Sequence, residues 1–332
     1  MSLATANLEL TPAKWPSIQR LAKRNVPDAM YLMGVAYLLG GLVDADSKRS
    51  YFWFCKAANL RHPDAAFRAG FLLQHGRVED PNTTADMWFL KAEELQSPAG
   101  LCAMGNRWTY QKLNQQRWWH KYWSRSDSSP EAVAAYERYR KATQGSSEYP
   151  AAHYYLGVHT LKGWGTAKNK AQAMEYFEKA VEHRDRDAAF ALALCHSYNS
   201  PEYWMRMEQA ADWGNSEAQY KLALALLARR TTESATQAVN WLRKASIQRN
   251  PKAMLLLSQT FAYGRTLPVD FPNAWRWARR CQSLGGCSQN WVDKLFRKIP
   301  HDQQVTLASE SVEDDKDFHA MSMTLFGAPG SF

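Results

Sequence analysis

Basic and aromatic side chains alternate in one short segment, where they could bind an acidic peptide or stack on a nucleotide base. The segment reads QQRWWHKYWSR and its candidate binding residues are Arg117, Trp118, Trp119, Lys121 and Trp123. Arginine and lysine attract anions, and tryptophan adds stacking and cation–π contacts. Trp119 and Trp123 are also four residues apart, the spacing of an apolar stripe on a helix. The segment therefore predicts either a binding surface or an additional helix packed on the fold.

Catalytic and metal-binding motifs are missing from the sequence. Its nine histidines and five cysteines are scattered, with no His-Glu-x-x-His and no Cys-x-x-Cys. No Gly-x-Ser-x-Gly or phosphate-binding loop occurs, and Gly163 and Gly165 follow an expected helix, whereas a dinucleotide loop follows a strand. We therefore expect no catalytic residue, no metal and no cofactor, and the chain is predicted not to be an enzyme.

A small residue recurs along most of the chain at a nearly constant interval. The recurring positions are Gly34, Gly70, Gly105, Gly157, Ala193, Ala223 and Ser258. Successive positions are 30 to 36 residues apart, except for 52 residues between Gly105 and Gly157. A fixed period in this range predicts stacked helical repeats, and the long interval predicts an insertion at about 109–128.

Each repeat reads as two helices joined by a turn. In the unit that starts at Ala151, apolar residues recur every three or four positions on both sides of Gly163 and Gly165. In its second helix an aromatic residue, Tyr176, precedes a small residue, Ala180, by four positions. Four other units carry the same pair: Trp53 with Ala57, Trp88 with Ala92, Trp241 with Ala245, and Trp277 with Cys281. The sequence therefore predicts an all-α fold.

These units resemble the Sel-one-like repeat, a relative of the tetratricopeptide repeat with the consensus A-x-x-x-L-G-x-x-Y, a G-x-G turn and A-x-x-W-Y-x-K-A-A. The resemblance covers 29–285 and is clearest in 29–58 and 152–180. The last three units depart from it, because they carry Ala193, Ala223 and Ser258 in place of glycine. The resemblance implies a right-handed α/α superhelical solenoid of about seven helix-turn-helix repeats that serves as a protein-interaction scaffold. It implies no single reaction.

The repeats and their flanks define four parts of the chain. We expect an N-terminal capping helix in 1–28, the repeat array in 29–285 and C-terminal capping helices in 286–309. The last part, 310–332, starts with the acidic run ESVEDDKD and continues with apolar residues. It is predicted either to be a flexible tail or to dock, on a partner or back onto the basic face of the array.

A second aromatic column stands two positions after the start of each repeat. Its members are Tyr31, Phe67, Tyr154, Phe190 and Tyr220. They could line a groove, but a repeat array must bury some such column between its units, which favours a core role. Exposed polar residues of the first helices, Gln74, His153 and Gln259, are the better groove candidates.

A protein-interaction scaffold or adaptor is therefore the predicted function, with a protein or peptide partner. A bacterial secretion-system accessory, effector chaperone or immunity protein would fit it. Nucleic-acid binding through the Trp-rich insertion is the alternative, since the formal net charge is +9. No apolar run reaches the length of a membrane span and no signal-peptide pattern opens the sequence, so we expect a cytoplasmic protein without membrane insertion.

Overall fold

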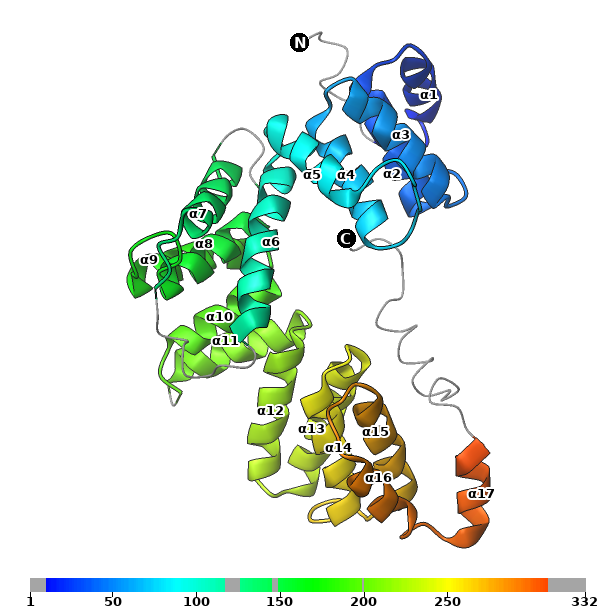
Figure 1. The fold of residues 1–332 in the computed structure, drawn as a ribbon. Coiled ribbons are helices and arrows are strands. Elements are labelled where there is room, and N and C mark those ends of the chain that lie inside the picture. Colours follow the sequence, from blue (N-terminus) through cyan, green and yellow to red (C-terminus); the bar gives the residue numbers. More distant parts are fainter. Residues whose placement is uncertain (1–9, 117–125, 145–148, 199, 310–332) are drawn as a thin grey trace. The chain divides into compact units, whose positions relative to one another are not determined.

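The described part of the chain is helical throughout. The computed structural model describes residues 10–116, 126–144, 149–198 and 200–309, and within these ranges it contains 17 α-helices and no strand (Figure 1). The predicted all-α fold class is confirmed. The chain divides into two compact units, Met1–Ala180 and Val181–Phe332.

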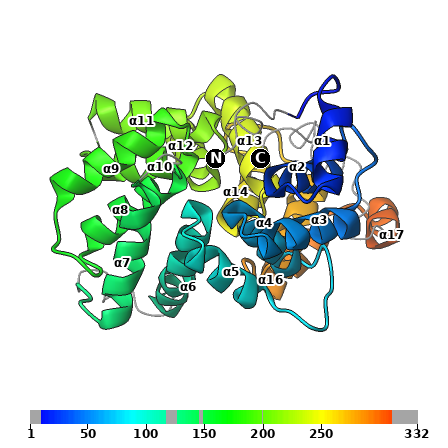
Figure 2. The same ribbon diagram turned by 90° about the horizontal axis from the view of Figure 1, so that it is seen from above.

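The first unit contains four helical hairpins preceded by one helix. Its helices are α1 (Trp15–Lys23), α2 (Pro27–Leu39), α3 (Ser47–Asn59), α4 (Pro63–Gln74), α5 (Ala85–Glu94), α6 (Pro98–Gln116), α7 (Pro130–Ala142), α8 (Ala151–Lys162) and α9 (Lys170–Glu182), the last of which ends just past the boundary. Neighbouring helices such as α7, α8 and α9 lie side by side in both views (Figures 1 and 2).

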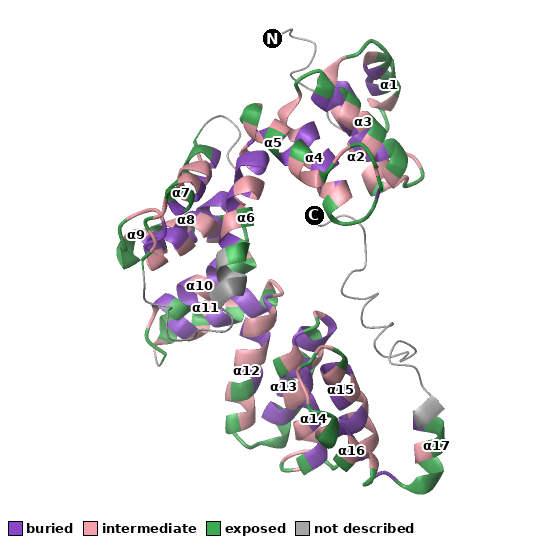
Figure 3. Cartoon of the chain, in the orientation of Figure 1, coloured by how far each residue is buried: buried purple, intermediate pink, exposed green. Residues whose placement is uncertain are grey.

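The second unit contains three hairpins followed by two shorter helices. Its helices are α10 (Arg186–Cys195), α11 (Pro201–Asp212), α12 (Ser216–Ala228), α13 (Thr232–Ile247), α14 (Pro251–Tyr263), α15 (Phe271–Ser283), α16 (Gln289–Phe296) and α17 (His301–Ser309). In both units, buried residues occur along nearly every helix (Figure 3). This distribution is expected when each hairpin buries its apolar surface against the next.

Short polar residues fix where many helices begin. The side chains that accept a hydrogen bond from a first-turn backbone N–H include those of Asp46, Thr84, Ser129, Asn215 and Asn250. Such caps satisfy N–H groups that have no partner within the helix. A proline in the first turn, as in α7 and α14, supports the same boundary because its missing N–H is not needed there.

The recurring glycine of the first helix packs against an aromatic ring of the second helix in the same hairpin. A Cβ atom added at Gly34 would lie 2.5 Å from the Phe54 ring, and one added at Gly70 would lie 2.7 Å from the Phe89 ring. Gly105 meets Tyr139 and Gly157 meets Phe177 in the same way. The four facing rings each lie three residues before the small residue of the second-helix pair, or before Ala142 in α7. Only glycine leaves room for them.

In the later hairpins both the glycine of the first helix and the facing aromatic ring of the second helix are replaced. Three residues before the corresponding small residue, α11 carries Met207, α13 carries Leu242 and α15 carries Ala278. Met207 shares a buried cluster with Ala193, and Leu242 shares one with Ala223. Where the facing side chain is not aromatic, the first helix therefore accommodates alanine or serine. This explains the departures from the repeat pattern.

Two features expected from the sequence are the insertion in the third unit and the capping helices at both ends of the array. Helix α6 continues to Gln116, so the first residues of the predicted insertion are helical. Contacts of the buried Thr109 with α7 and α8 stabilise this extension. Helices α1, α16 and α17 occur where caps were predicted, and Ile18 and Leu307 join the neighbouring cores. The capping roles stay predictions, and residues 117–125 and 310–332 lie outside the described residues.

Candidate functional site

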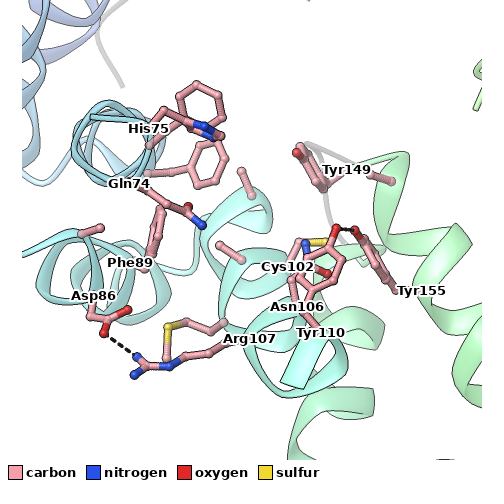
Figure 4. A pocket seen from close by; sticks show the side chains of 17 residues that line it. Gln74, His75, Asp86, Phe89, Cys102, Asn106, Arg107, Tyr110, Tyr149 and Tyr155 are labelled. Atoms are coloured by element: carbon pink, nitrogen blue, oxygen red, sulfur yellow. Dashed lines mark hydrogen bonds and ion pairs between the residues drawn. The ribbon is translucent and has the colours of Figure 1, made fainter. Parts of the chain in front are cut away.

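A cavity of about 670 Å³ opens in the first unit among α4, α6 and α8 (Figure 4). Its lining from these helices includes Phe67, Phe71 and Gln74 of α4, Ala99, Cys102, Ala103 and Tyr110 of α6, and Tyr155 of α8. The volume falls in the range of pockets that bind ligands or side chains. We call this cavity the α4–α6–α8 groove.

Helical spacing explains why these side chains share one groove. Phe67, Phe71 and Gln74 follow each other at intervals of four and three residues, which places them on one face of α4. On α6, Ala99, Ala103 and Tyr110 have intervals of four and seven residues, again one face. Small residues form the middle of the α6 face, so the groove is open between two aromatic walls.

One wall is a row of rings on α4 and α5. The ring centroids of Phe67 and Phe89 are 5.9 Å apart, those of Phe67 and Phe71 are 6.3 Å apart, and those of Phe71 and His75 are 4.2 Å apart. These distances are those of ring pairs in contact. The wall therefore presents a continuous aromatic surface, which is apolar along its three phenylalanines.

The opposite wall is built from tyrosines. The hydroxyl oxygens of Tyr110 and Tyr155 are 2.8 Å apart (Figure 4). The ring of Tyr155 stacks on that of Tyr139, with 5.0 Å between the ring centroids. Burial raises the pKa of Tyr155, so its phenol is neutral at ordinary pH. Tyr110 is 53% exposed and presents its ring at the groove edge.

The charged and thiol groups of the groove are not arranged for catalysis. Arg107 Nη1 lies 2.8 Å from Asp86 Oδ2, and both side chains are about half exposed. Asn106 Oδ1 accepts a hydrogen bond from the Tyr139 hydroxyl at 3.0 Å. Burial raises the pKa of the Cys102 thiol, which keeps it protonated and a poor nucleophile. The site is suited to holding a side chain rather than to transferring a proton or a group.

A buried polar network fastens α6 to α7 and α8 behind the groove. Thr109 Oγ1 lies 2.8 Å from the Tyr139 hydroxyl and 2.9 Å from His159 Nε2. His159 Nδ1 lies 3.0 Å from the carbonyl oxygen of Trp164. Burial lowers the pKa of His159 to about 4, so the imidazole is neutral. The network holds the ring of Tyr139, on which Tyr155 of the groove stacks.

The structure places the sequence-predicted site residues in different environments. Gln74 lines the groove. His153 is 4% exposed, so the expectation of an exposed side chain is wrong for this residue, which faces the core of its hairpin stack. Gln259 is partly exposed on α14, in the second unit. Arg117, Trp118, Trp119, Lys121 and Trp123 lie outside the described residues.

Sequence reasoning missed most of the groove. The aromatic column was expected in the core, and Tyr31, Phe190 and Tyr220 do pack against buried clusters. Phe67 contacts the core and also lines the groove. A second aromatic residue four positions later, Phe71, was the available signal, because it extends the wall along the same face.

Two other kinds of feature are absent from the described residues, a metal-binding cluster and a membrane-spanning helix. No group of three or more His, Cys, Asp or Glu side chains in these ranges could hold a metal ion. No helix among them is both long and apolar enough to cross a membrane.

Five hairpins match the sequence pattern of a known repeat. The pattern of the Sel1 repeat matches residues 27–62, 63–97, 150–185, 216–250 and 251–280, more than half of the chain. The chain belongs to the Sel1 repeat family. The matched Sel1 repeats correspond to α2–α3, α4–α5, α8–α9, α12–α13 and α14–α15. The hairpins between them are α6–α7, which contains the predicted insertion, and α10–α11.

Related proteins are named as regulators of an enzyme. "Chitin synthase regulatory factor 2" of Schizosaccharomyces pombe is 24% identical over 257 residues, which are 76% of this chain and 43% of that protein. "Chitin synthase regulator SKT5" of Saccharomyces cerevisiae is 23% identical over 298 residues, 84% of this chain and 40% of that protein. The chain therefore spans less than half the length of these two relatives.

A solved structure supports the same architecture. The Sel1 repeat protein from Oxalobacter formigenes is 25% identical, has a TM-score of 0.55, and aligns over 85% of this chain and 79% of its own. The all-α helical-repeat solenoid predicted from the sequence is confirmed.

Proposed function

We propose that this chain is a non-enzymatic interaction scaffold or adaptor, and that the α4–α6–α8 groove binds an extended segment of a partner protein. The aromatic-walled cavity of about 670 Å³ is the observation that carries the proposal. Its polar groups are engaged with one another, as in the Tyr110–Tyr155 and Arg107–Asp86 pairs. The surface left for a partner is therefore mainly apolar.

An apolar or aromatic side chain of the partner is the expected occupant. Burying such a side chain contributes about 1.5–3 kcal/mol, because apolar area leaves water. The groove walls are set by helix packing, so a partner does not have to order them on binding. A peptide that places one large apolar residue between Phe71 and Tyr110 would use both walls.

The relatives support a regulatory variant of this proposal. Two of them are named for regulating chitin synthase, which indicates action on another protein. By analogy, this chain is proposed to hold or present a partner protein. The more specific roles of a bacterial secretion-system accessory, effector chaperone or immunity protein, and a cytoplasmic location, belong to the same proposal.

Affinity capture with groove variants tests it. The full chain is used to capture partners, which are identified by mass spectrometry, and the capture is repeated with Phe71→Ala and Tyr110→Ala. Each variant removes one wall, and we expect the affinity for the partner to fall about tenfold or more, as for loss of an aromatic anchor.

Tyr263→Ala is the matched control. Tyr263 is 56% exposed on α14, close to the 53% of Tyr110, but it lies in the second unit. We expect it to retain the partner. If both groove variants retain the partner equally well, the groove is not the binding site.

Nuclease treatment of the captured material tests the alternative function, nucleic-acid binding. Loss of that material after the treatment would favour nucleic-acid binding through the segment that contains Arg117 and Lys121.

A further inference from the structure

The end of the second unit carries a concentrated positive charge. Between Phe271 and His301 the sequence contains one acid, Asp293. It contains six basic residues: Arg276, Arg279, Arg280, Lys294, Arg297 and Lys298. Residues 221–252 have a similar surplus, with seven basic residues and one acid, Glu233, but the charges of α15, α16 and the residues that follow α16 lie closer in the sequence to an acidic run.

Aromatic rings organise part of this charge into one strip. The Arg279 guanidinium lies 4.8 Å from the Trp275 ring centroid, and Lys298 Nζ lies 5.1 Å from that of Phe271. Phe271 and Trp275 are four residues apart on α15, so they share one face. The rings of Trp275 and Phe296 are 5.3 Å apart, which joins this face to α16. The two cations therefore lie along a single α15–α16 surface.

Three of the basic side chains are available to an anion. Lys294, Arg297 and Lys298 are exposed, and in the part of the chain that the structure describes none of them forms an ion pair. The nearby carboxylate of Asp293 accepts a hydrogen bond from Gln289 Nε2 at 2.7 Å. Arg276 and Arg279 add charge on the α15 side. We call these five residues, Arg276, Arg279, Lys294, Arg297 and Lys298, the basic surface.

The sequence that follows α17 contains a segment of complementary charge. Residues 310–317, ESVEDDKD, contain five acids and one lysine. They follow α17 directly, and Leu307 of α17 is 3% exposed in the same buried cluster as Trp275. At about 3.5 Å per extended residue, the acids can reach about 10 to 35 Å from Leu307. That reach covers both α15 and α16.

We propose that the acidic segment 310–317 binds the basic surface of its own chain. The inference goes beyond the proposed function, because it concerns the second unit and requires no partner. A short tether gives the segment an effective concentration in the millimolar range, so several individually weak ion pairs suffice to hold it. The contact depends on exposed charges and therefore weakens as salt is added.

Carbodiimide cross-linking of the full chain tests the contact. The reagent joins a lysine amine to a carboxylate that touches it, and peptide mapping identifies the pair. At low salt we expect links from Lys294 or Lys298 to the acids between Glu310 and Asp317. At about 1 M salt the screening length falls to about 3 Å, and these links should be lost. Mixing isotope-labelled and unlabelled protein distinguishes links within one copy from links between copies.

Two sets of substitutions make the result specific. Glu310→Gln, Glu313→Gln, Asp314→Asn, Asp315→Asn and Asp317→Asn together neutralise the segment and should abolish the links. Glu175→Gln with Glu178→Gln removes exposed acids of α9 in the first unit and should leave the links unchanged. Glu175 and Glu178 are both exposed, and the circular-dichroism spectrum verifies that each variant is folded.

Charge reversal of the surface gives a second, independent readout. Arg297→Glu with Lys298→Glu should eliminate the remaining Lys294 links and increase hydrogen exchange of residues 310–317. The proposal is overturned if links form only between copies, if they persist at high salt or in the neutralised segment, or if none forms at low salt. It is likewise overturned if exchange of 310–317 is the same in the reversed variant and the parent.

Discussion

The imidazole of His159 is completely buried, and its two hydrogen bonds determine which ring nitrogen carries the hydrogen. The Trp164 carbonyl oxygen can only accept, so Nδ1 carries the hydrogen and donates it. Nε2 then accepts from the Thr109 hydroxyl. A second proton would place an uncompensated charge in the core, and burial accordingly lowers the pKa to about 4.

This residue should make the fold sensitive to mild acid. Histidine in an unfolded chain has a pKa of about 6.5, so the unfolded state binds more protons than the folded state between about pH 6.5 and about pH 4. The stabilisation is complete above about pH 6.5 and is lost as the pH falls through that window. We expect the free energy of unfolding to drop by about 2 kcal/mol from about pH 7 to about pH 5, measured by urea denaturation.

His159→Gln is the control for this pH dependence. Glutamine keeps a hydrogen-bond donor and an acceptor but does not titrate. The free energy of unfolding of the variant should therefore decrease much less between about pH 7 and about pH 5 than that of the parent. A smaller pH dependence will persist, because burial also lowers the pKa of His62. An equal drop in the parent and the variant would show that His159 is not its source.

At the scale of the helical hairpin, stability depends on the match between one small residue and one facing side chain. Gly157→Ala places a methyl group against the ring of Phe177. Alanine favours the helix by about 1 kcal/mol over glycine, but overpacking a core costs about 1–3 kcal/mol. We expect a net loss of up to about 2 kcal/mol in the free energy of unfolding, measured by chemical denaturation.

A compensating change should recover part of that loss. Gly157→Ala combined with Phe177→Leu reproduces the combination of α12 and α13, where Ala223 and Leu242 share a cluster. The double variant should therefore be more stable than Gly157→Ala alone. A double variant less stable than the single one would mean that the facing pair does not govern the packing.

The same pairing shows how far the sequence could predict the fold and the groove. The spacing of Gly34, Gly70 and Gly157 predicts helical hairpins because each contact is formed within one repeat. The groove requires more distant residues, since Tyr155 joins Tyr110 only after α6 and α8 have packed together. The extension of α6 likewise depends on contacts of Thr109 with Tyr139 and His159, which no local pattern reveals.

At the scale of the whole molecule, a repeat array should confine the effect of a substitution. Each repeat contacts chiefly its neighbours, so stability is close to a sum of local terms. For Gly157→Ala, hydrogen exchange followed by mass spectrometry should increase in α8 and α9 and remain unchanged in α14 and α15. Faster exchange throughout both units would instead indicate that the chain unfolds as one cooperative body.

Each matched glycine and ring lie within one hairpin, so the boundaries of a duplication or deletion decide whether the pair stays together. A duplication or deletion whose boundaries fall between hairpins keeps every pair together, as Gly70 stays with Phe89. A crossover inside a hairpin would join Ala223 to Phe177, which collide, or Gly157 to Leu242, which leave a gap. Recombination at hairpin boundaries is therefore the route by which this array can gain or lose units without repacking its interior.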